Sequence, residues 1–119
     1  MDTLTIKGMR FRGLHGVHDY EKKEGNDFEV DVIFNTDLTA PGASDQLKDA
    51  IDYTRVHEIA SSVLFGDSKN LIEHLCLRIG NHIQDAFQNQ SNFEVVVRKL
   101  NPPLDSEVNY TEARMSWPR

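Results

Sequence analysis

A lysine that ends an apolar strand is the first residue of this sequence that could carry chemistry. Lys99 continues the alternating phase of Phe93, Val95 and Val97, so the pattern places it on the core side, at the end of a strand. A partly desolvated lysine at such a position could act as a general base or as a nucleophile. The alternative is that the strand has already ended there and that the side chain extends to water.

Three further residues could take part in chemistry, and each also has a purely structural interpretation. Glu73 follows Asn70 by three residues, which is typical of a capping box at a helix start, but its carboxylate could also accept paired N–H donors from a ligand. Tyr53 precedes a predicted helix, where it either packs at the helix entrance or offers its ring and hydroxyl to a flat ligand. Glu21 belongs to the charged stretch 19–24, which by default is a solvated loop.

Little in the sequence indicates a metal or a nucleotide. Among the five histidines, His15 and His18 are three positions apart, and no Cys-x-x-Cys or His-x-Glu grouping supports them as ligands. The chain has no Gly-x-Gly-x-x-Gly motif, no Walker loop and no Gly-x-Ser-x-Gly motif. We therefore expect no metal and no cofactor.

Composition narrows the class of protein further. The chain has 119 residues with 13 Lys and Arg against 19 Asp and Glu, a net charge of −6, and this length predicts one domain over 1–119. The negative charge argues against nucleic acid as a partner, because phosphates need a positive field, and against an anionic membrane surface. The single cysteine, Cys76, cannot form an internal disulfide, no apolar run approaches about 20 residues, and the first residues lack a signal-peptide core. We therefore expect a cytoplasmic location.

Hydrophobic periodicity predicts the elements that must position these side chains. Period-two alternation predicts strands that begin near residue 3, span 28–34, span 93–97, and run from about 108 to 117. The helical period predicts a helix over 56–64, ended by Gly66, and another over 71–87, with Asn70 as its N-cap and Glu73 at the N3 position. The stretch 39–52 is predicted to be a loop, and Asn101-Pro102-Pro103 a break in the chain.

The order of these elements is strand, strand, helix, helix, strand, strand. It predicts an α+β fold with a four-stranded antiparallel sheet and two helices on one face. Such a sheet has two free edges and one uncovered face, which assembly can protect. We therefore expect a homo-oligomer.

Six short segments follow one another over nearly the whole chain. They are Ile6-Lys7-Gly8-Met9-Arg10-Phe11, Leu14-His15-Gly16, Glu21 with Gly25 and Phe28, Asp52-Tyr53, Asn70-Leu71-Ile72-Glu73-His74-Leu75, and Lys99-Leu100-Asn101-Pro102-Pro103. In this order and spacing they resemble the dihydroneopterin aldolase family of folate biosynthesis. One departure is Gly25-Asn26-Asp27-Phe28, where family members often carry Gly-Gln and one more residue before the phenylalanine.

The resemblance implies a tunnelling fold, in which the sheets of four subunits join into a barrel and two rings stack as an octamer with active sites between subunits. Glu73 then matches the glutamate that anchors the pterin, with the main chain of Ile72 beside it. Tyr53 matches a tyrosine of the neighbouring subunit that assists proton transfer. Lys99 matches the catalytic lysine, and Glu21 matches a glutamate supplied across the interface near the substrate side chain.

The resemblance also implies a reaction, the metal-independent retro-aldol cleavage of 7,8-dihydroneopterin, with 2′-epimerisation as a possible side activity. Two alternatives stay open. A 2′-epimerase of the same fold that acts on dihydroneopterin triphosphate would need a basic cluster, for which the candidates are Lys22, Lys23, Arg10 and Arg12. A non-catalytic pterin-binding subunit is the alternative from another class.

Overall fold

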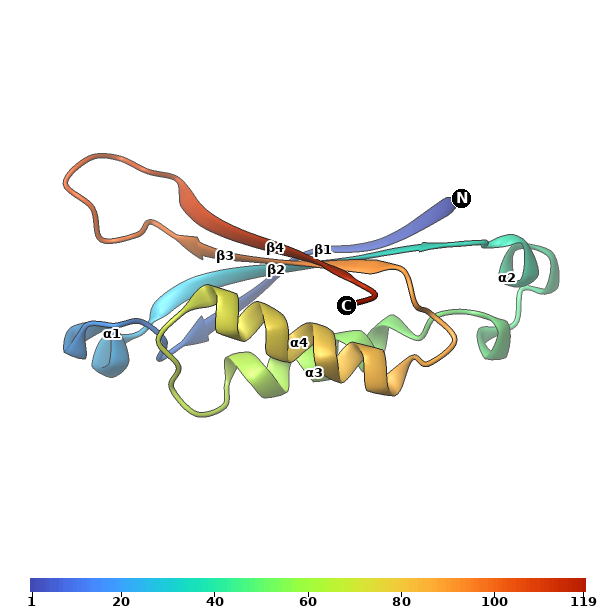
Figure 1. The fold of residues 1–119 in the computed structure, drawn as a ribbon, viewed down its shortest axis with the longest axis horizontal. Helices are drawn as coiled ribbons and strands as arrows, with labels where there is room; N and C mark the ends of the chain where they lie inside the picture. The colour runs from blue at the N-terminus through green and yellow to red at the C-terminus, as the bar shows by residue number, and fades with distance from the viewer.

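Four strands pair in chain order into one antiparallel sheet. The computed structural model describes residues 1–119, and Figure 1 shows the sheet lying above the two long helices. The strands are β1 (Asp2–Gly13), β2 (Asn26–Thr36), β3 (Phe93–Leu100) and β4 (Tyr110–Trp117). Because β1 and β4 each have one neighbour, both outer edges of the sheet are free within the chain.

Two long helices, α3 (Tyr53–Leu64) and α4 (Ile72–Ala86), cover one face of this sheet (Figure 1). The Asp52 carboxylate caps α3 by accepting the N–H of Thr54 at 3.0 Å. The shorter helical elements are α1 (Asp19–Glu24), α2 (Thr39–Ser44) and the 3₁₀ turn η1 (Leu47–Asp49). No helix combines the length and the apolar character that crossing a membrane requires. The predicted α+β class, with two helices on one face, is confirmed.

The core fills the space between the sheet and the two long helices and contains 20 buried apolar residues. Phe28, Phe34 and Phe93 are among its fully buried side chains. Gly80 lets α4 approach β4 closely, since a Cβ at this position would lie 1.8 Å from the Trp117 ring. The position of α4, which carries candidate site residues at its start, is therefore set by this close contact.

Gly8 marks a β-bulge that we did not predict from the alternation in β1. The pairing of β1 with β2 shifts register between Ile6 and Met9, and Gly8 has a φ of 74°. The extra residue moves the apolar phase by one position, so that Ile6 and Met9 both pack against the core. The N–H of Gly8 donates to Asp31 Oδ1 at 2.8 Å, which satisfies the group that the bulge removes from the ladder.

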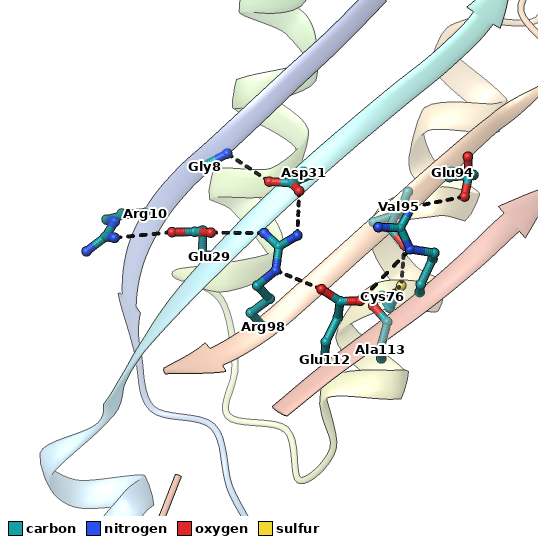
Figure 2. A network of polar contacts seen from close by, with 11 residues as sticks. Gly8, Arg10, Glu29, Asp31, Cys76, Glu94, Val95, Arg98, Glu112 and Ala113 are labelled. Carbon is teal, nitrogen blue, oxygen red and sulfur yellow. Dashed lines mark hydrogen bonds and ion pairs between the residues drawn. The ribbon is translucent and has the colours of Figure 1, made fainter. Parts of the chain in front are cut away.

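The uncovered face of the sheet carries a belt of polar contacts centred on Arg98 (Figure 2). The guanidinium donates to Glu29 at 2.9 Å, to Asp31 at 2.7 Å and to Glu112 at 2.8 Å. Because Asp31 also accepts from Gly8, this Arg98 belt joins all four strands. Burial disfavours the charge on Asp31, but the hydrogen bonds from Arg98 and Gly8 outweigh burial and hold the pKa of this carboxyl below its ordinary value.

Two predicted boundaries are wrong. The stretch 39–52 is not a loop throughout, because local hydrogen bonds such as Asp45 N–H to the Pro41 carbonyl at 3.0 Å close the short helix α2. The last strand begins at Tyr110 rather than near 108. The N–H of Asn101 bonds to the carbonyl of Asn109 at 3.0 Å, so the intervening residues form a loop and leave the ladder.

The start of α4 also differs from the prediction. The helix begins at Ile72, its N-cap residue is Leu71, and no side chain caps it. Asn70 is not the N-cap, because its Oδ1 accepts from Lys22 Nζ at 2.7 Å, and a bond to a charged donor is stronger than a neutral one. Glu73 is therefore the second residue of the helix, and its carboxylate has no capping role.

Candidate active site

A pocket of about 340 Å³ lies at one end of the sheet, where α1, the start of α4 and the end of β3 meet. In Figure 1 this is the end at which α1 and the long β3–β4 loop lie. Its lining residues are Val17, His18, Glu21, Asn70, Leu71, Ile72, Glu73, Lys99, Pro102, Pro103, Leu104 and Thr111. Polar groups from several segments converge on this hollow, which makes it the candidate active site.

Lys99 and Glu21 meet in this pocket although 78 positions separate them in the chain. The Nζ atom of Lys99 lies 3.5 Å from Oε1 of Glu21, and the two side chains are 14% and 1% exposed. Lys99 therefore lines the pocket and does not extend to water. The prediction of a solvated loop at Glu21 is wrong, because this residue lies in α1 and is buried. The resemblance implied a glutamate from across a subunit interface, whereas Glu21 contacts the lysine of its own chain.

The side chain of Glu21 packs so closely against Gly16 that no larger residue fits at this position. A Cβ at Gly16 would lie 1.7 Å from Glu21 Oε2. This Oε2 is the one buried side-chain oxygen or nitrogen with no hydrogen-bond partner in the chain. A buried polar atom without a partner is rare and costly. The carboxylate is thus ready to accept a hydrogen bond from a water or from a hydroxyl of a ligand.

Glu73 and Ile72 provide another wall of the pocket, at the first turn of α4. The Glu73 side chain is exposed and forms no ion pair or side-chain hydrogen bond with the rest of the chain. Both of its oxygens are free to accept a pair of parallel N–H bonds from a planar ring. The N-terminal end of the helix favours the negative charge of this carboxylate.

Tyr53 lies elsewhere. It is the first residue of α3 and is 64% exposed, so it does not pack as a staple at the helix entrance. It lines a second pocket, together with Ile6, Met9, Thr54 and His57. One chain thus brings Lys99, Glu21, Glu73 and Ile72 together, and leaves Tyr53 outside.

Thr111 and His18 also line the pocket, although the sequence did not indicate them as site residues. Thr111 pairs with Lys99 across β3 and β4, and only the register of the sheet reveals this. His18 precedes α1 and stacks on Tyr20 with ring centroids 5.4 Å apart. The His15-x-x-His18 spacing was the available signal, but we weighed it only for metal binding.

His15 does not reach the pocket surface and lies behind it, 1% exposed. Its Nε2 donates to the Leu64 carbonyl at 2.8 Å, and its Nδ1 accepts the N–H of Lys69 at 3.0 Å. Burial lowers the pKa of His15 below its ordinary value of 6.5, so the ring is neutral at pH 7. The carbonyl of His15 accepts a hydrogen bond from Asn26 Nδ2 at 2.9 Å. Asn26, where family members often carry glutamine, therefore stabilises the backbone at His15.

Neither a thiol nor a set of metal ligands is available at the pocket. The Cys76 thiol is buried and donates to the Val95 carbonyl at 3.3 Å, and burial raises its pKa to about 11. A thiol that stays protonated is a poor nucleophile. No three His, Cys, Asp or Glu side chains gather into a group that could hold a metal ion.

Comparisons with known proteins agree with this arrangement. The family model for dihydroneopterin aldolase (FolB) matches residues 4–116. The dihydroneopterin aldolase of Staphylococcus epidermidis is 38% identical over 103 residues, which cover 87% of this chain and 85% of that protein. The Bacillus subtilis dihydroneopterin aldolase is 34% identical over 104 residues, covering 87% of both chains.

The fold is also shared with a solved structure. Escherichia coli dihydroneopterin aldolase in complex with neopterin aligns with a TM-score of 0.87 at 18% identity and covers 98% of both chains. At 18% identity this likeness shows a shared fold and nothing more. Family membership is shown instead by the family model and by the two sequence relatives. On these matches, which span most of its length, the chain belongs to the dihydroneopterin aldolase family.

Proposed function

We propose that this protein cleaves 7,8-dihydroneopterin into 6-hydroxymethyl-7,8-dihydropterin and glycolaldehyde, as a cytoplasmic enzyme of folate biosynthesis. The whole chain, 1–119, would act as one aldolase domain. The observation that carries the proposal is the Lys99–Glu21 pair, held 3.5 Å apart in a pocket that the free Glu73 carboxylate also lines. A proton-transfer pair and a planar anchor in one pocket are what a retro-aldol reaction on a pterin needs.

Glu73 would bind the pterin ring. Its two free carboxylate oxygens would accept hydrogen bonds from the 2-amino group and the adjacent ring N–H, and the main chain of Ile72 would add a contact beside them. Holding the flat ring in one orientation brings its side chain toward Lys99, which lies in the same pocket. Orientation of this kind can supply a large part of the rate acceleration.

The chemistry needs proton transfers and an electron sink. The 2′-hydroxyl loses its proton as the C1′–C2′ bond breaks, and glycolaldehyde leaves. The electron pair of that bond moves into the ring C=N next to the side chain, and the ring nitrogen takes up a proton. Protonation of C1′, with loss of the proton from the ring nitrogen, then restores the C=N bond and gives the hydroxymethyl product. The substrate is thus its own electron sink, so neither a Schiff base nor a metal is required.

Lys99 and Glu21 would carry these protons. Lys99 is proposed as the general acid and base that acts through a water on the 2′-hydroxyl and the ring nitrogen. The unpartnered Oε2 of Glu21 would accept from the substrate side chain or from that water. Tyr53 is proposed to deliver the proton to the cleaved carbon.

Tyr53 lines a different pocket from Lys99, so we further propose that the working site forms between two subunits. The free edges of β1 and β4 support this assembly, because unpaired strand edges invite pairing with another sheet. A ring of four subunits, stacked in pairs as an octamer, is the arrangement proposed.

The test is a product assay. The purified protein is incubated with 7,8-dihydroneopterin in excess EDTA, and the pterins are separated by chromatography. Formation of 6-hydroxymethyl-7,8-dihydropterin is the expected result. No product, with dihydroneopterin triphosphate epimerised instead, would contradict the proposal, and tight binding of neopterin without any turnover would point to a non-catalytic subunit.

The epimerase alternative has less support from the structure. A triphosphate needs cations at the pocket, but none of the four candidates is among the residues that line it. Lys22 donates to Asn70 at 2.7 Å. Arg10 and Arg12 form ion pairs with Glu29 and Asp27 at 3.3 and 3.1 Å.

A further inference from the structure

The walls of the pocket belong to separate segments of the chain. The β1–β2 strap, residues 14–25, carries Glu21, and the α3–α4 connection, residues 65–71, leads directly into Ile72 and Glu73. The distance between the two carboxylates therefore depends on how the strap is held against the connection.

Some of the bonds between these segments are exposed to water. Ser68 Oγ donates to the Leu14 carbonyl, and Lys22 Nζ donates to Asn70 Oδ1 at 2.7 Å, both at exposed positions. Water competes for such groups, and an exposed contact of a flexible lysine stabilises a structure little. They do not by themselves explain how the two walls keep a fixed separation.

His15 provides the buried connection. Its Nε2 donates to the carbonyl of Leu64, the last residue of α3, and its Nδ1 accepts the N–H of Lys69 in the connection. A neutral ring with its proton on Nε2 satisfies both bonds at once. Phe28 packs edge-on against the ring at 5.5 Å, which limits rotation of the imidazole.

The next residue of the strap adds a bond to the same point. The N–H of Gly16 donates to the carbonyl of Lys69 at 2.9 Å. The strap thus holds both the N–H and the C=O of Lys69, and Gly16 also makes room for Glu21. Because Asn70, Leu71 and Ile72 follow at once, fixing this residue fixes the entry into α4.

We propose that His15 is a positioning residue: by holding the backbone of Lys69 it sets the separation of Glu73 from Glu21 across the pocket. His15 itself touches no substrate in this arrangement, since it is absent from the pocket lining. The inference rests on the proposed function, in which Glu73 holds the pterin ring and the Lys99–Glu21 pair acts on its side chain.

Three substitutions separate the two bonds of His15. In His15→Asn, the amide oxygen stands close to the place of Nδ1 and can still accept the N–H of Lys69. In His15→Gln, the amide nitrogen stands close to the place of Nε2 and can donate to Leu64, but Lys69 loses its acceptor. His15→Phe removes both bonds and keeps the ring. His82→Asn, at an exposed position on α4, is the matched control.

Three readouts are compared at a temperature at which every variant is folded: hydrogen exchange of the Lys69 amide, the Kd for neopterin, and kcat and KM for 7,8-dihydroneopterin. We expect His15→Asn and the control to keep the amide protected and the Kd within about threefold of wild type. We expect His15→Gln and His15→Phe to lose the protection of the Lys69 amide. In both variants the Kd for neopterin should rise and kcat/KM should fall by about tenfold or more, because the groups that bind the substrate are misplaced.

The proposal is overturned if His15→Phe keeps the protection of Lys69 and wild-type affinity, or if all His15 variants lose activity only in proportion to their melting temperatures. Should His15→Phe fail to fold, the Asn and Gln variants alone decide, because they differ in which bond survives. If wild type itself does not cleave dihydroneopterin, the proposed function fails, whereas amide exchange and neopterin affinity still decide whether His15 positions the wall.

Discussion

The Lys99–Glu21 pair places one buried and one partly buried charge in this pocket. An unpaired buried carboxylate is costly, and the only cation within 4 Å of Glu21 is the Lys99 ammonium. At 3.5 Å the contact is long for a bond between charges. One oxygen of Glu21 remains unpartnered. The pair is thus held in place yet open to a third group, which is how a proton-transfer site differs from a structural ion pair.

The first prediction concerns the separate roles of Lys99 in proton transfer and of Glu73 in pterin binding. Lys99→Ala should lower kcat by about 10²–10⁴-fold, because it removes the general acid and base, and should change the neopterin Kd little. Glu73→Gln should instead weaken neopterin binding, because an amide cannot accept both N–H bonds. The product assay and a binding titration measure these effects. Lys48→Ala, at an exposed position in η1, is the control, and near-normal turnover by Lys99→Ala would refute the role of the lysine.

The second prediction concerns the stability of the fold as a function of pH. Burial, together with the nearby charges of Lys22, Lys69 and Lys99, lowers the pKa of His15 below 6.5. The folded state therefore binds its proton less readily than the unfolded state. The contribution of neutral His15 to the free energy of unfolding is therefore fully present above pH 6.5. It is lost as the pH falls from 6.5 through the lower pKa that His15 has in the folded state.

Denaturant unfolding at a series of pH values measures this effect. The free energy of unfolding should decrease below pH 6.5 by up to about 1.4 kcal/mol per pH unit, and His15→Asn should remove that part of the slope. His82→Asn, at an exposed position, should not. An unchanged slope in the His15 variant would contradict the assignment.

The strands and helices place these residues through two devices, one on each face of the sheet. On the covered face, the absence of a side chain at Gly80 lets α4 pack against Trp117 of β4. On the uncovered face, the Arg98 belt joins the four strands (Figure 2). Arg98 directly precedes Lys99 in β3. The belt thus ties the last residues of β3, where the lysine enters the pocket, to β2 and β4.

The third prediction tests that belt. Arg98→Met should reduce the free energy of unfolding by about 3–5 kcal/mol, because it leaves the buried Asp31 without its cation. Arg55→Met is the matched control, since Arg55 pairs with Glu58 at 3.4 Å outside the belt and is 55% exposed, against 10% for Arg98. The control should cost less than about 1 kcal/mol. Equal effects in urea unfolding of the two variants would show that the belt contributes no more than a surface ion pair.

At the scale of the whole molecule, one chain holds only part of the proposed site. The chain is elongated, with extents of 50 × 27 × 25 Å, and both edges of its sheet are unpaired. Tyr53 lies in a pocket with residues of β1 and α3, whereas Lys99 lies at the end of β3. If both residues serve one reaction, a second copy of the chain must supply one of them.

The fourth prediction follows from that division. Lys99→Ala and Tyr53→Phe should each lose most activity alone, but mixed assemblies formed by co-expression should regain about a quarter of the wild-type activity, because a quarter of the sites then combine two intact residues. Native mass spectrometry of the same samples should show tetramers or octamers of 13.6 kDa subunits. A monomeric protein with full activity, or mixtures as inactive as their parents, would contradict a site between subunits.

Much of the fold could be predicted from the sequence because its pattern is local. The alternation from Phe28 to Phe34 and the helical stripes of α3 and α4 depend on neighbours within a few positions, and such patterns predict strand and helix reliably. The same holds for the break at Pro102 and Pro103. The six short segments that resemble the aldolase family were also readable without coordinates, and they indicated every residue now proposed for the reaction.

Only the tertiary structure decided how those residues are arranged. The sequence predicted a solvated loop at Glu21, but this residue is buried. Gly16 leaves room for its side chain, and Lys99, which is 78 positions away in the sequence, pairs with its carboxylate. Asn70 was predicted to cap a helix, but its side-chain oxygen accepts a hydrogen bond from the Lys22 ammonium instead. The resemblance matched Tyr53 to a tyrosine of the neighbouring subunit, and the structure shows that it lies in a different pocket of its own chain from Lys99. Burial and pairing depend on which distant segments meet, and periodicity along the chain contains no information about that.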